Sequence, residues 1–159
     1  MKIARVLVLA LLLASCASYD GYNLRPGVST EAELRQVMGK PALEFTNADS
    51  SRELAFARGP LGAQTYMAHV SRDGIVQVVK QVLTDGVFNA IQPGMTQDEV
   101  LRLIGPPREK MSFARLAQVA WDYKYRDTWG YDSIFSVTFD ADGRVVSKIS
   151  QRIERSHNF

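Results

Sequence analysis

Hydrophobic and polar positions follow the same order of patterns twice along the chain. Hydrophobic residues recur at helical spacing within residues 30–38 and again within residues 96–104. Each stretch begins with a threonine that can cap a helix N-terminus and carries a glutamate three residues later, which completes a capping box. Gly39 and Gly105 then provide C-terminal stops. The pattern predicts one short helix in each half of the chain.

After each helix, the spacing changes to the strict alternation that is typical of half-buried strands. In the second half, residues 119–126 and 135–139 alternate, and Asp142-Gly143 is a hairpin signal before a returning strand at 145–153. The first half repeats this order with segments 54–57 and 66–70, the turn Asp73-Gly74 and the strand 75–83. Each half is therefore expected to form an antiparallel sheet of three or four strands.

The two halves also share a sequence motif, since Arg25–Pro41 resembles Gln92–Pro107 from Thr30 and Thr96 onward. We predict an α+β fold of two tandem repeats, each a short helix or helix pair packed on its sheet. A unit of this size is marginally stable alone, so the two are expected to pack together or to share a continuous sheet surface. The expected segments are a signal peptide (1–15), a lipidated tether (16–23), repeat 1 (24–83), a linker (84–90), repeat 2 (91–155) and a tail (156–159).

The N-terminus has the order of a secretory signal. Lys2 and Arg5 precede an uncharged run at 6–14, which is too short for a transmembrane helix of about 20 residues. Leu13, Ala14 and Ser15 then lead to Cys16, and this tetrapeptide resembles a bacterial lipobox. An ordinary signal peptide with a cysteine near its cleavage site is the alternative.

The lipobox resemblance implies that cleavage leaves Cys16 as the first residue, with diacylglycerol on its thiol and an acyl chain such as palmitate on its amino group. Two or three such chains anchor a protein almost permanently, whereas one binds reversibly. Ala17 follows the cysteine in place of an aspartate, and by the sorting rule of well-studied Gram-negative bacteria this favours the outer membrane. We expect a lipid-anchored protein on the periplasmic side of the outer membrane. Tyr19 and Tyr22 lie in the tether, where they would either rest among lipid headgroups or pack on the folded domain.

Composition argues against several functional classes. Without Lys2 and Arg5 the chain has 17 basic and 17 acidic residues, which gives no basic excess for nucleic-acid binding. Cys16 is the one cysteine, so no internal disulfide forms, and His69 and His157 match no zinc or haem spacing. No phosphate-binding or dinucleotide glycine pattern occurs. We expect no enzyme activity, no metal and no cofactor besides the covalent lipid.

Aromatic residues cluster in the second repeat. Trp121, Tyr123 and Tyr125 alternate along one strand, where covering the sheet face beneath the helix and binding a ligand are the two interpretations. The other face is expected to be solvated or to dock a protein, and we place on it Asp122, Lys124, Arg126, Ser136, Thr138, Lys148, Ser150 and Arg152. A loop with Trp129 and Tyr131 follows, and aromatic residues beside charges are typical of interface hot spots. The candidate partner contacts are Trp129, Tyr131, Lys124 and Arg126.

Three motifs of the second repeat resemble the SmpA/OmlA (BamE) lipoprotein family. They are Pro93-Gly94-Met95-Thr96, Ile104-Gly105-Pro106-Pro107 and Trp121-Asp122-Tyr123. The resemblance is good over residues 91–154 and weaker over 24–83. It implies a small helix-and-sheet lipoprotein that supports the machinery inserting β-barrel proteins into the outer membrane.

A typical member of that family has one such unit, whereas this chain has two. Tandem units of this shape resemble the β-lactamase inhibitor protein family, whose members usually contain disulfides that this chain cannot form. The sequence therefore leads to two hypotheses. The first is a non-catalytic adaptor or stabiliser of an outer-membrane complex, in β-barrel assembly or envelope integrity, with lipid and an envelope protein as its partners. The alternative is an inhibitor or sequestering module of a periplasmic enzyme.

Overall fold

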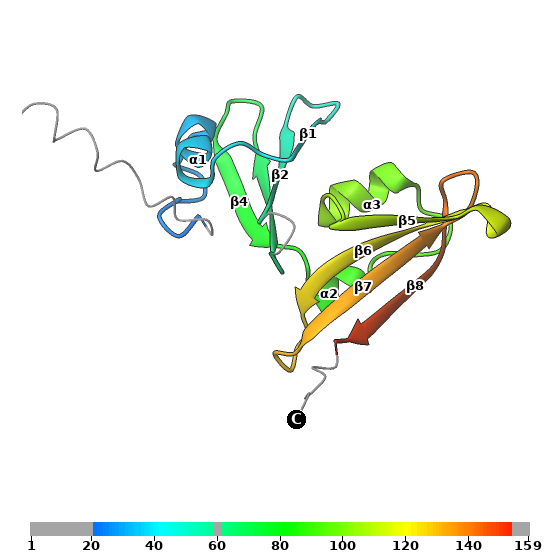
Figure 1. Ribbon diagram of the computed structural model, residues 1–159. Helices are drawn as coiled ribbons and strands as arrows, with labels where there is room; N and C mark the ends of the chain where they lie inside the picture. Colours follow the sequence, from blue (N-terminus) through cyan, green and yellow to red (C-terminus); the bar gives the residue numbers. More distant parts are fainter. Residues whose placement is uncertain (1–20, 59–61, 154–159) are drawn as a thin grey trace, which may run out of the picture.

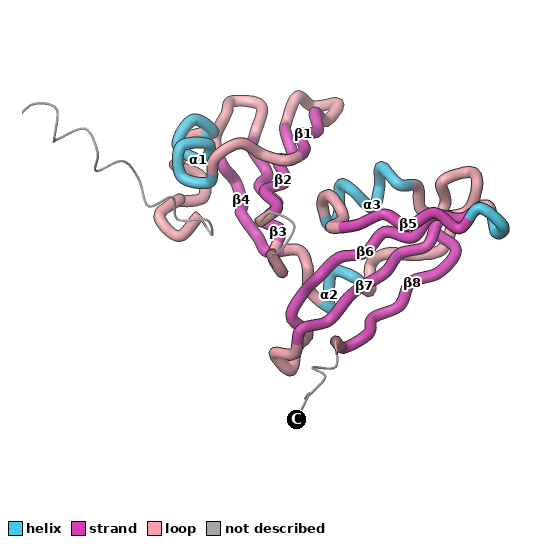
Figure 2. The backbone as a smooth tube through the Cα atoms, viewed as in Figure 1, coloured by secondary structure: helices cyan, strands magenta, loops and turns pink. Residues whose placement is uncertain are grey.

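The computed structural model describes residues 21–58 and 62–153, which form two α+β units with one four-stranded antiparallel sheet each (Figure 1). The first unit contains α1 (Glu31–Met38), β1 (Leu43–Thr46), β2 (Arg52–Ala57), β3 (Thr65–Val70) and β4 (Val76–Gln81). The second contains α2 (Asp85–Phe88), α3 (Gln97–Ile104), β5 (Glu109–Phe113), the 3₁₀ helix η2 (Ala114–Leu116), β6 (Gln118–Arg126), β7 (Asp132–Phe139) and β8 (Val145–Arg152). Each sheet pairs its strands in chain order, as Figure 2 shows, which confirms the predicted fold class.

Several predictions concern residues outside the described part of the chain. They are the signal peptide, the cleavage motif Leu13-Ala14-Ser15, the lipid-bearing Cys16, Tyr19 and the tail that contains His157. Tyr22 of the expected tether is described, and its side chain is exposed. None of the helices within residues 21–58 and 62–153 is long and apolar enough to span a membrane.

The predicted capping boxes are confirmed in both units. The Thr96 hydroxyl accepts a 3.3 Å hydrogen bond from the Glu99 N–H, and the Glu99 carboxylate accepts a 2.7 Å bond from the Thr96 N–H. Thr30 and Glu33 form the same pair at the start of α1. Because two of the unpaired N–H groups at each helix start are satisfied locally, these eight-residue helices begin at a defined residue.

In each unit, backbone hydrogen bonds join the segment of the Pro-Gly motif to the hairpin of the Asp-Gly motif. In the second unit, the Gly94 N–H donates to the Val145 carbonyl, Val145 N–H donates to the Met95 carbonyl, and Gln97 N–H donates to the Gly143 carbonyl. The first unit repeats the three bonds with Gly27–Val76, Val76–Ser29 and Glu31–Gly74. The segment before each helix is thus joined to the final hairpin of its sheet, which fixes the helix across one face.

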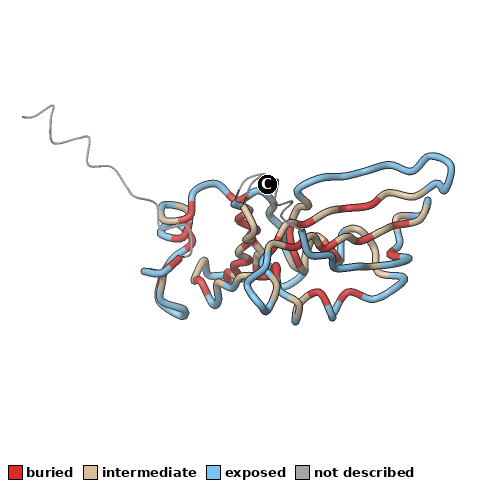
Figure 3. Tube along the Cα trace, turned by 60° about the horizontal axis from the view of Figure 1, so that its bottom comes forward, coloured by how far each residue is buried: buried red, intermediate tan, exposed pale blue. Residues whose placement is uncertain are grey.

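Each helix covers the hydrophobic face of its own sheet. In the first unit, Leu34 and Met38 of α1 pack with Leu54 and Ala68. In the second, Val100 and Ile104 of α3 pack over the aromatic face, where Trp121, Tyr123 and Tyr125 are at most 2 % exposed. This confirms that the aromatic series covers the sheet beneath the helix. Figure 3 shows the buried positions recurring along the strands of both sheets.

The segment 84–90, predicted as a linker, contains α2. The Thr84 hydroxyl accepts a hydrogen bond from the Val87 N–H, and Phe88 is 3 % exposed in the core of the second unit. The Phe88 ring stacks on Phe135 with centroids 3.9 Å apart. The connection is therefore part of the second unit, because an aromatic side chain of α2 completes that core. The other domain boundaries stay predictions.

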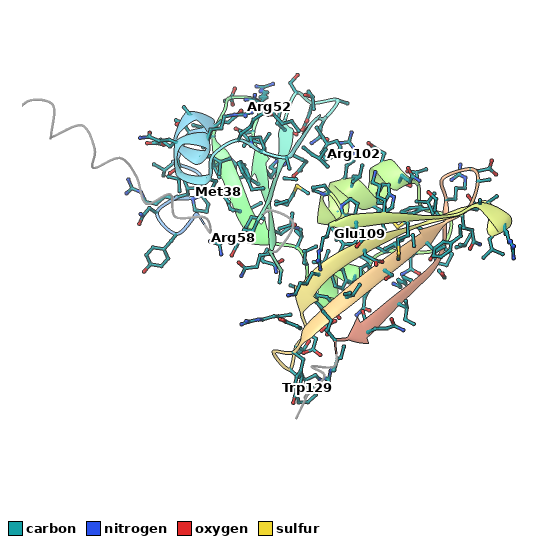
Figure 4. The ribbon with its side chains drawn as sticks, viewed as in Figure 1. Met38, Arg52, Arg58, Arg102, Glu109 and Trp129 are labelled. Atoms are coloured by element: carbon teal, nitrogen blue, oxygen red, sulfur yellow. The ribbon has the colours of Figure 1, made fainter. Side chains whose placement is uncertain are left out.

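The two units pack together through the second face of the first sheet. Ala55 and Met67 point away from α1 and belong to the same hydrophobic cluster as Ile104. Arg102 of α3 reaches the first unit (Figure 4), where it donates a 3.3 Å hydrogen bond to Asn47 and lies 4.5 Å from the Phe45 ring centroid. The sheets remain separate, so packing of one unit on the other is confirmed and a continuous sheet is not formed.

Candidate partner-binding hairpin

The hairpin between β6 and β7, residues 127–131, presents two aromatic side chains to solvent. Trp129 is 77 % exposed and Tyr131 is 57 % exposed. Figure 4 shows Trp129 at the hairpin that joins the ends of β6 and β7. Large aromatic side chains are usually buried, and exposed ones that lie together commonly mark interaction sites.

Asp127 holds the hairpin from within. Its Oδ1 atom accepts hydrogen bonds of 2.9 Å from the backbone N–H groups of both Trp129 and Tyr131. The Gly130 N–H donates to the Asp127 carbonyl at 2.8 Å. Asp127 Oδ2 accepts a 2.7 Å bond from Arg152 on β8, whose guanidinium lies 4.5 Å from the Tyr131 ring centroid. One carboxylate therefore fixes the backbone of both exposed aromatic residues.

Asp85 of α2 holds the hairpin from the other side. Its Oδ2 atom accepts bonds from the Thr128 hydroxyl at 2.6 Å and from the Thr128 N–H at 3.0 Å. Its Oδ1 atom accepts a 2.9 Å bond from the Tyr125 hydroxyl. A short helix that precedes the sheet in sequence thus clamps the hairpin to the rest of the unit.

The two anchoring carboxylates are stabilised in their ionised forms. The hydrogen bond from the Thr128 hydroxyl lowers the pKa of Asp85 against opposing burial, and the bonds from Tyr125 and the Thr128 N–H act in the same direction. At Asp127 burial opposes ionisation, but the hydrogen bonds from Tyr131, Arg152 and Trp129 together lower its pKa. The carboxylates of Asp85 and Asp127 therefore both carry a full negative charge at neutral pH.

A pocket of about 240 Å³ lies beside the hairpin, lined by Trp129 together with Asp85, Tyr125, Asp127, Ser133, Ser150, Gln151 and Arg152. Its lining is polar, and its carboxylates already accept hydrogen bonds from the protein. Within residues 21–58 and 62–153, no cluster of three histidine, cysteine or acidic residues could hold a metal ion. The arrangement offers a rigid aromatic projection beside a shallow polar recess.

Lys124 and Arg126, the other predicted contacts, lie apart from the tip of the hairpin. Both approach Asp132, at 3.3 Å from Lys124 Nζ and 3.6 Å from Arg126 Nε. The side chain of Lys124 is 25 % exposed and that of Arg126 is 73 % exposed. The structure brings Trp129 and Tyr131 into one exposed group, and it places the two basic residues on the neighbouring β6 strand. Partner contact by all four residues stays a prediction.

The predicted polar face of the second sheet needs a correction at β8. Lys148, Ser150 and Arg152 pair with Val137, Phe135 and Ser133, so they lie on the same face as the buried aromatic residues. The cause is a register shift between Thr138 and Phe139, which reverses the faces that simple alternation assigns. No residue type in this segment signals the shift.

Lys148 has a structural role that the sequence analysis missed. Its Nζ atom donates to the carbonyls of Phe88 at 2.9 Å, Asn89 at 3.2 Å and Ile91 at 2.5 Å. An ammonium is well placed there, because carbonyls at the end of a helix lack partners within the helix. Lys148 thereby holds α2 against β8 and supports the Asp85 clamp.

Comparison with known proteins finds a resemblance in the second unit. Residues 81–149 match the model of the outer membrane protein assembly factor BamE domain. The C-terminal unit is similar to the BamE domain over these residues. The match includes α2, in agreement with the packing of Phe88 in that unit. No curated protein matches the chain at a significant level.

Three solved structures resemble the chain at low TM-scores. A putative osmotically inducible lipoprotein OsmE shares 26 % identity over 42 % of this chain and 75 % of its own, with a TM-score of 0.37. A DUF4309 family protein, YjgB from Bacillus subtilis, shares 12 % identity over 82 % of each chain, with a TM-score of 0.31. A putative β-lactamase inhibitor protein from Streptococcus mutans shares 9 % identity over 79 % of this chain and 84 % of its own, with a TM-score of 0.33. The similarity to the BamE domain therefore rests on the match of residues 81–149 alone.

Proposed function

We propose that this protein is a lipid-anchored, non-catalytic adaptor that docks an envelope protein through the 127–131 hairpin of its BamE domain. The BamE match supports a role in outer-membrane assembly or as an envelope lipoprotein. The observation that carries the docking role is the exposed Trp129, held on a hairpin that Asp127 and Asp85 fix. The partner belongs to an outer-membrane complex, of which the β-barrel assembly machinery is the leading candidate.

The physical reason is preorganisation. Tryptophan and tyrosine contribute disproportionately to binding energy in protein interfaces. Ordering a flexible loop on binding costs free energy, and this hairpin has its backbone hydrogen bonds in place beforehand. Less of the energy gained by burying Trp129 would therefore be lost to ordering the loop.

Localisation forms the second part of the proposal. Lipid on Cys16 would hold the protein on the periplasmic side of the outer membrane. Residues 17–23 extend to no more than about 23 Å, so the folded units would stay close to the bilayer surface. A partner embedded in that membrane would then meet the hairpin at a high effective concentration.

Copurification from crosslinked, detergent-solubilised envelopes tests the docking role. Trp129→Ala should lose the partner, while Leu116→Ala should retain it. Leu116 is a suitable control because it is 66 % exposed and lies in η2, at the opposite end of the β6 strand (Figure 1). Equal recovery with both variants would contradict the proposed hairpin contact. Recovery of a single soluble enzyme with the wild-type chain would favour the inhibitor hypothesis.

A further inference from the structure

A cleft runs along the junction of the two units, beside the end of α3 and strand β6. One part holds about 190 Å³ and reaches Pro106, Pro107 and Arg108 after α3. The other holds about 360 Å³ and reaches Arg126 and Asp132. Arg58, Gln64 and Lys124 line both parts, so the two adjoin, and we treat them together as one cleft. The larger part lies at the lower end of the range of about 300–1,000 Å³ for ligand pockets.

The cleft concentrates positive charge. Four basic side chains line it, namely Arg58, Arg108, Lys124 and Arg126. Among the described residues of its lining, Asp132 has the one negative charge, and that charge is already paired with Lys124 and Arg126. The chain that follows the predicted cleavage site has equal numbers of acidic and basic residues, so this excess is local. A local positive potential in a cleft attracts negatively charged ligands.

The floor of the cleft is apolar, and the Tyr123 hydroxyl there has a hydrogen-bond partner within the protein. Leu83 and Tyr123 are 4 % and 1 % exposed, and the prolines after α3 adjoin them. The Tyr123 hydroxyl donates a 3.2 Å hydrogen bond to the Gly105 carbonyl. Burial raises the pKa of Tyr123, so the floor stays neutral. A complementary ligand would therefore place carboxylates at the basic walls and small apolar groups on the floor.

We infer that this cleft receives an extended acidic segment of the protein that docks on the hairpin. The inference rests on the proposed function and specifies the partner's chemistry. Its support is continuity, because Arg126 and Asp132 of the cleft adjoin Asp127 and Tyr131 of the hairpin in sequence.

A peptide of alternating glutamate and leucine, six residues long and labelled with a fluorophore, is a direct probe. Fluorescence anisotropy with the full mature lipoprotein in detergent should show binding that weakens with salt. The matched peptide of alternating lysine and leucine should not bind. Lys124→Glu should weaken binding about tenfold, because the reversal replaces an attraction with a repulsion. Arg115→Glu makes the same change of net charge outside the cleft and should leave binding within twofold.

Arg126→Glu provides a second variant for the case in which loss of the Lys124–Asp132 ion pair disturbs folding. The Arg126 side chain is largely exposed, and Lys124 and Asp132 stay paired in this variant. Binding that survives Arg126→Glu unchanged, or falls equally with Arg115→Glu, would overturn the inference. So would Lys124-dependent flotation of the unlipidated Cys16→Ser protein with anionic vesicles in the absence of peptide binding, which would assign the cleft to lipid headgroups.

Trp129→Ala separates the two proposals. It should abolish partner recovery from membranes and leave binding of the acidic peptide intact. Partner loss with Trp129→Ala and no peptide binding would remove the cleft inference alone. Peptide binding with full partner recovery by Trp129→Ala would remove the proposed docking role alone.

Discussion

Gly105 lies against Thr65 across the junction of the two units. A Cβ atom on Gly105 would come within 2.8 Å of Thr65 Cγ2 and 3.5 Å of Ala55 Cβ. Gly39, the equivalent helix stop of the first repeat, has open space at the same position. Their φ angles are +75° and +81°, so both occupy the left-handed region that favours glycine. The two residues share a backbone role, and Gly105 alone also permits close packing of the units.

Gly105→Ala and Gly39→Ala should therefore differ in cost. Both variants incur the strain of alanine at positive φ with ψ near −155° and −164°, a region that is essentially restricted to glycine and costs about 1–3 kcal/mol. Gly105→Ala also forces a methyl group against Thr65, for which overpacking costs of about 1–3 kcal/mol are typical. Urea unfolding of the full chain should show Gly105→Ala to be less stable than Gly39→Ala by at least about 1 kcal/mol. Equal losses would mean that the units do not pack at this point.

Ala55 and Asp122 occupy equivalent positions of the two sheets but face different surroundings. Ala55 is fully buried opposite Met67 at the junction, while Asp122 accepts a 2.6 Å hydrogen bond from Ser136 on an uncovered face. Ala55→Asp would bury an unpaired carboxylate, and we expect a loss of about 3 kcal/mol or more. Asp122→Ala should cost about 1 kcal/mol or less. Thermal melting checks both, and a tolerated Ala55→Asp would argue against the observed junction.

The sequence predicted the features that depend on local chemistry. Capping by Thr30 and Thr96 follows from side-chain bonds within one turn, and burial of Trp121 follows from strict alternation. The sequence also predicts that Trp129 lies in a loop, because it stands between two alternating runs, and the structure shows this side chain exposed. These features need few contacts from distant residues.

Features that depend on distant partners were missed. Strand β5 is exposed at every position and shows no alternation, so its pairing with β6 is the one sign of a strand. The helix α2 depends on Phe88 packing against Phe135, 47 positions later in the chain. The clamp of Asp85 on Thr128 depends on the same long-range packing, and no local motif marks it.

Asp85 should make the order of the hairpin depend on pH. Its pKa is lowered in the folded state, so its contribution to stability is present above the usual aspartate value of about 3.9. That contribution is lost as pH falls through the lowered value. Backbone NMR order parameters of Thr128 and Trp129 should stay high at pH 6 and fall in acid before the core unfolds.

Asp85→Asn should reproduce at neutral pH the part of the acid state that depends on Asp85, since it removes that charge and keeps the shape. Thr128 and Trp129 should become more mobile, whereas Gly143 in the opposite hairpin should not change. Unchanged order at Thr128 in this variant would show that Asp127 alone fixes the hairpin.

Cys16→Ser tests the anchor. Removal of the acyl chains should shift the protein from the membrane fraction to the soluble fraction, since each buried methylene contributes about 0.8 kcal/mol to membrane binding. Fractionation with and without high salt measures the shift and excludes electrostatic adsorption. Normal maturation and unchanged membrane association of Cys16→Ser would mean that another feature holds the protein there.

The central claim is that the hairpin of the BamE-like unit contacts a partner in the native envelope. Replacement of Trp129 by a photo-crosslinking phenylalanine analogue, followed by illumination of living cells, tests it most directly. The account predicts a defined crosslinked species from position 129 and none from position 116. Crosslinking from position 116 alone, or from neither position while the protein stays folded and membrane-bound, would contradict it.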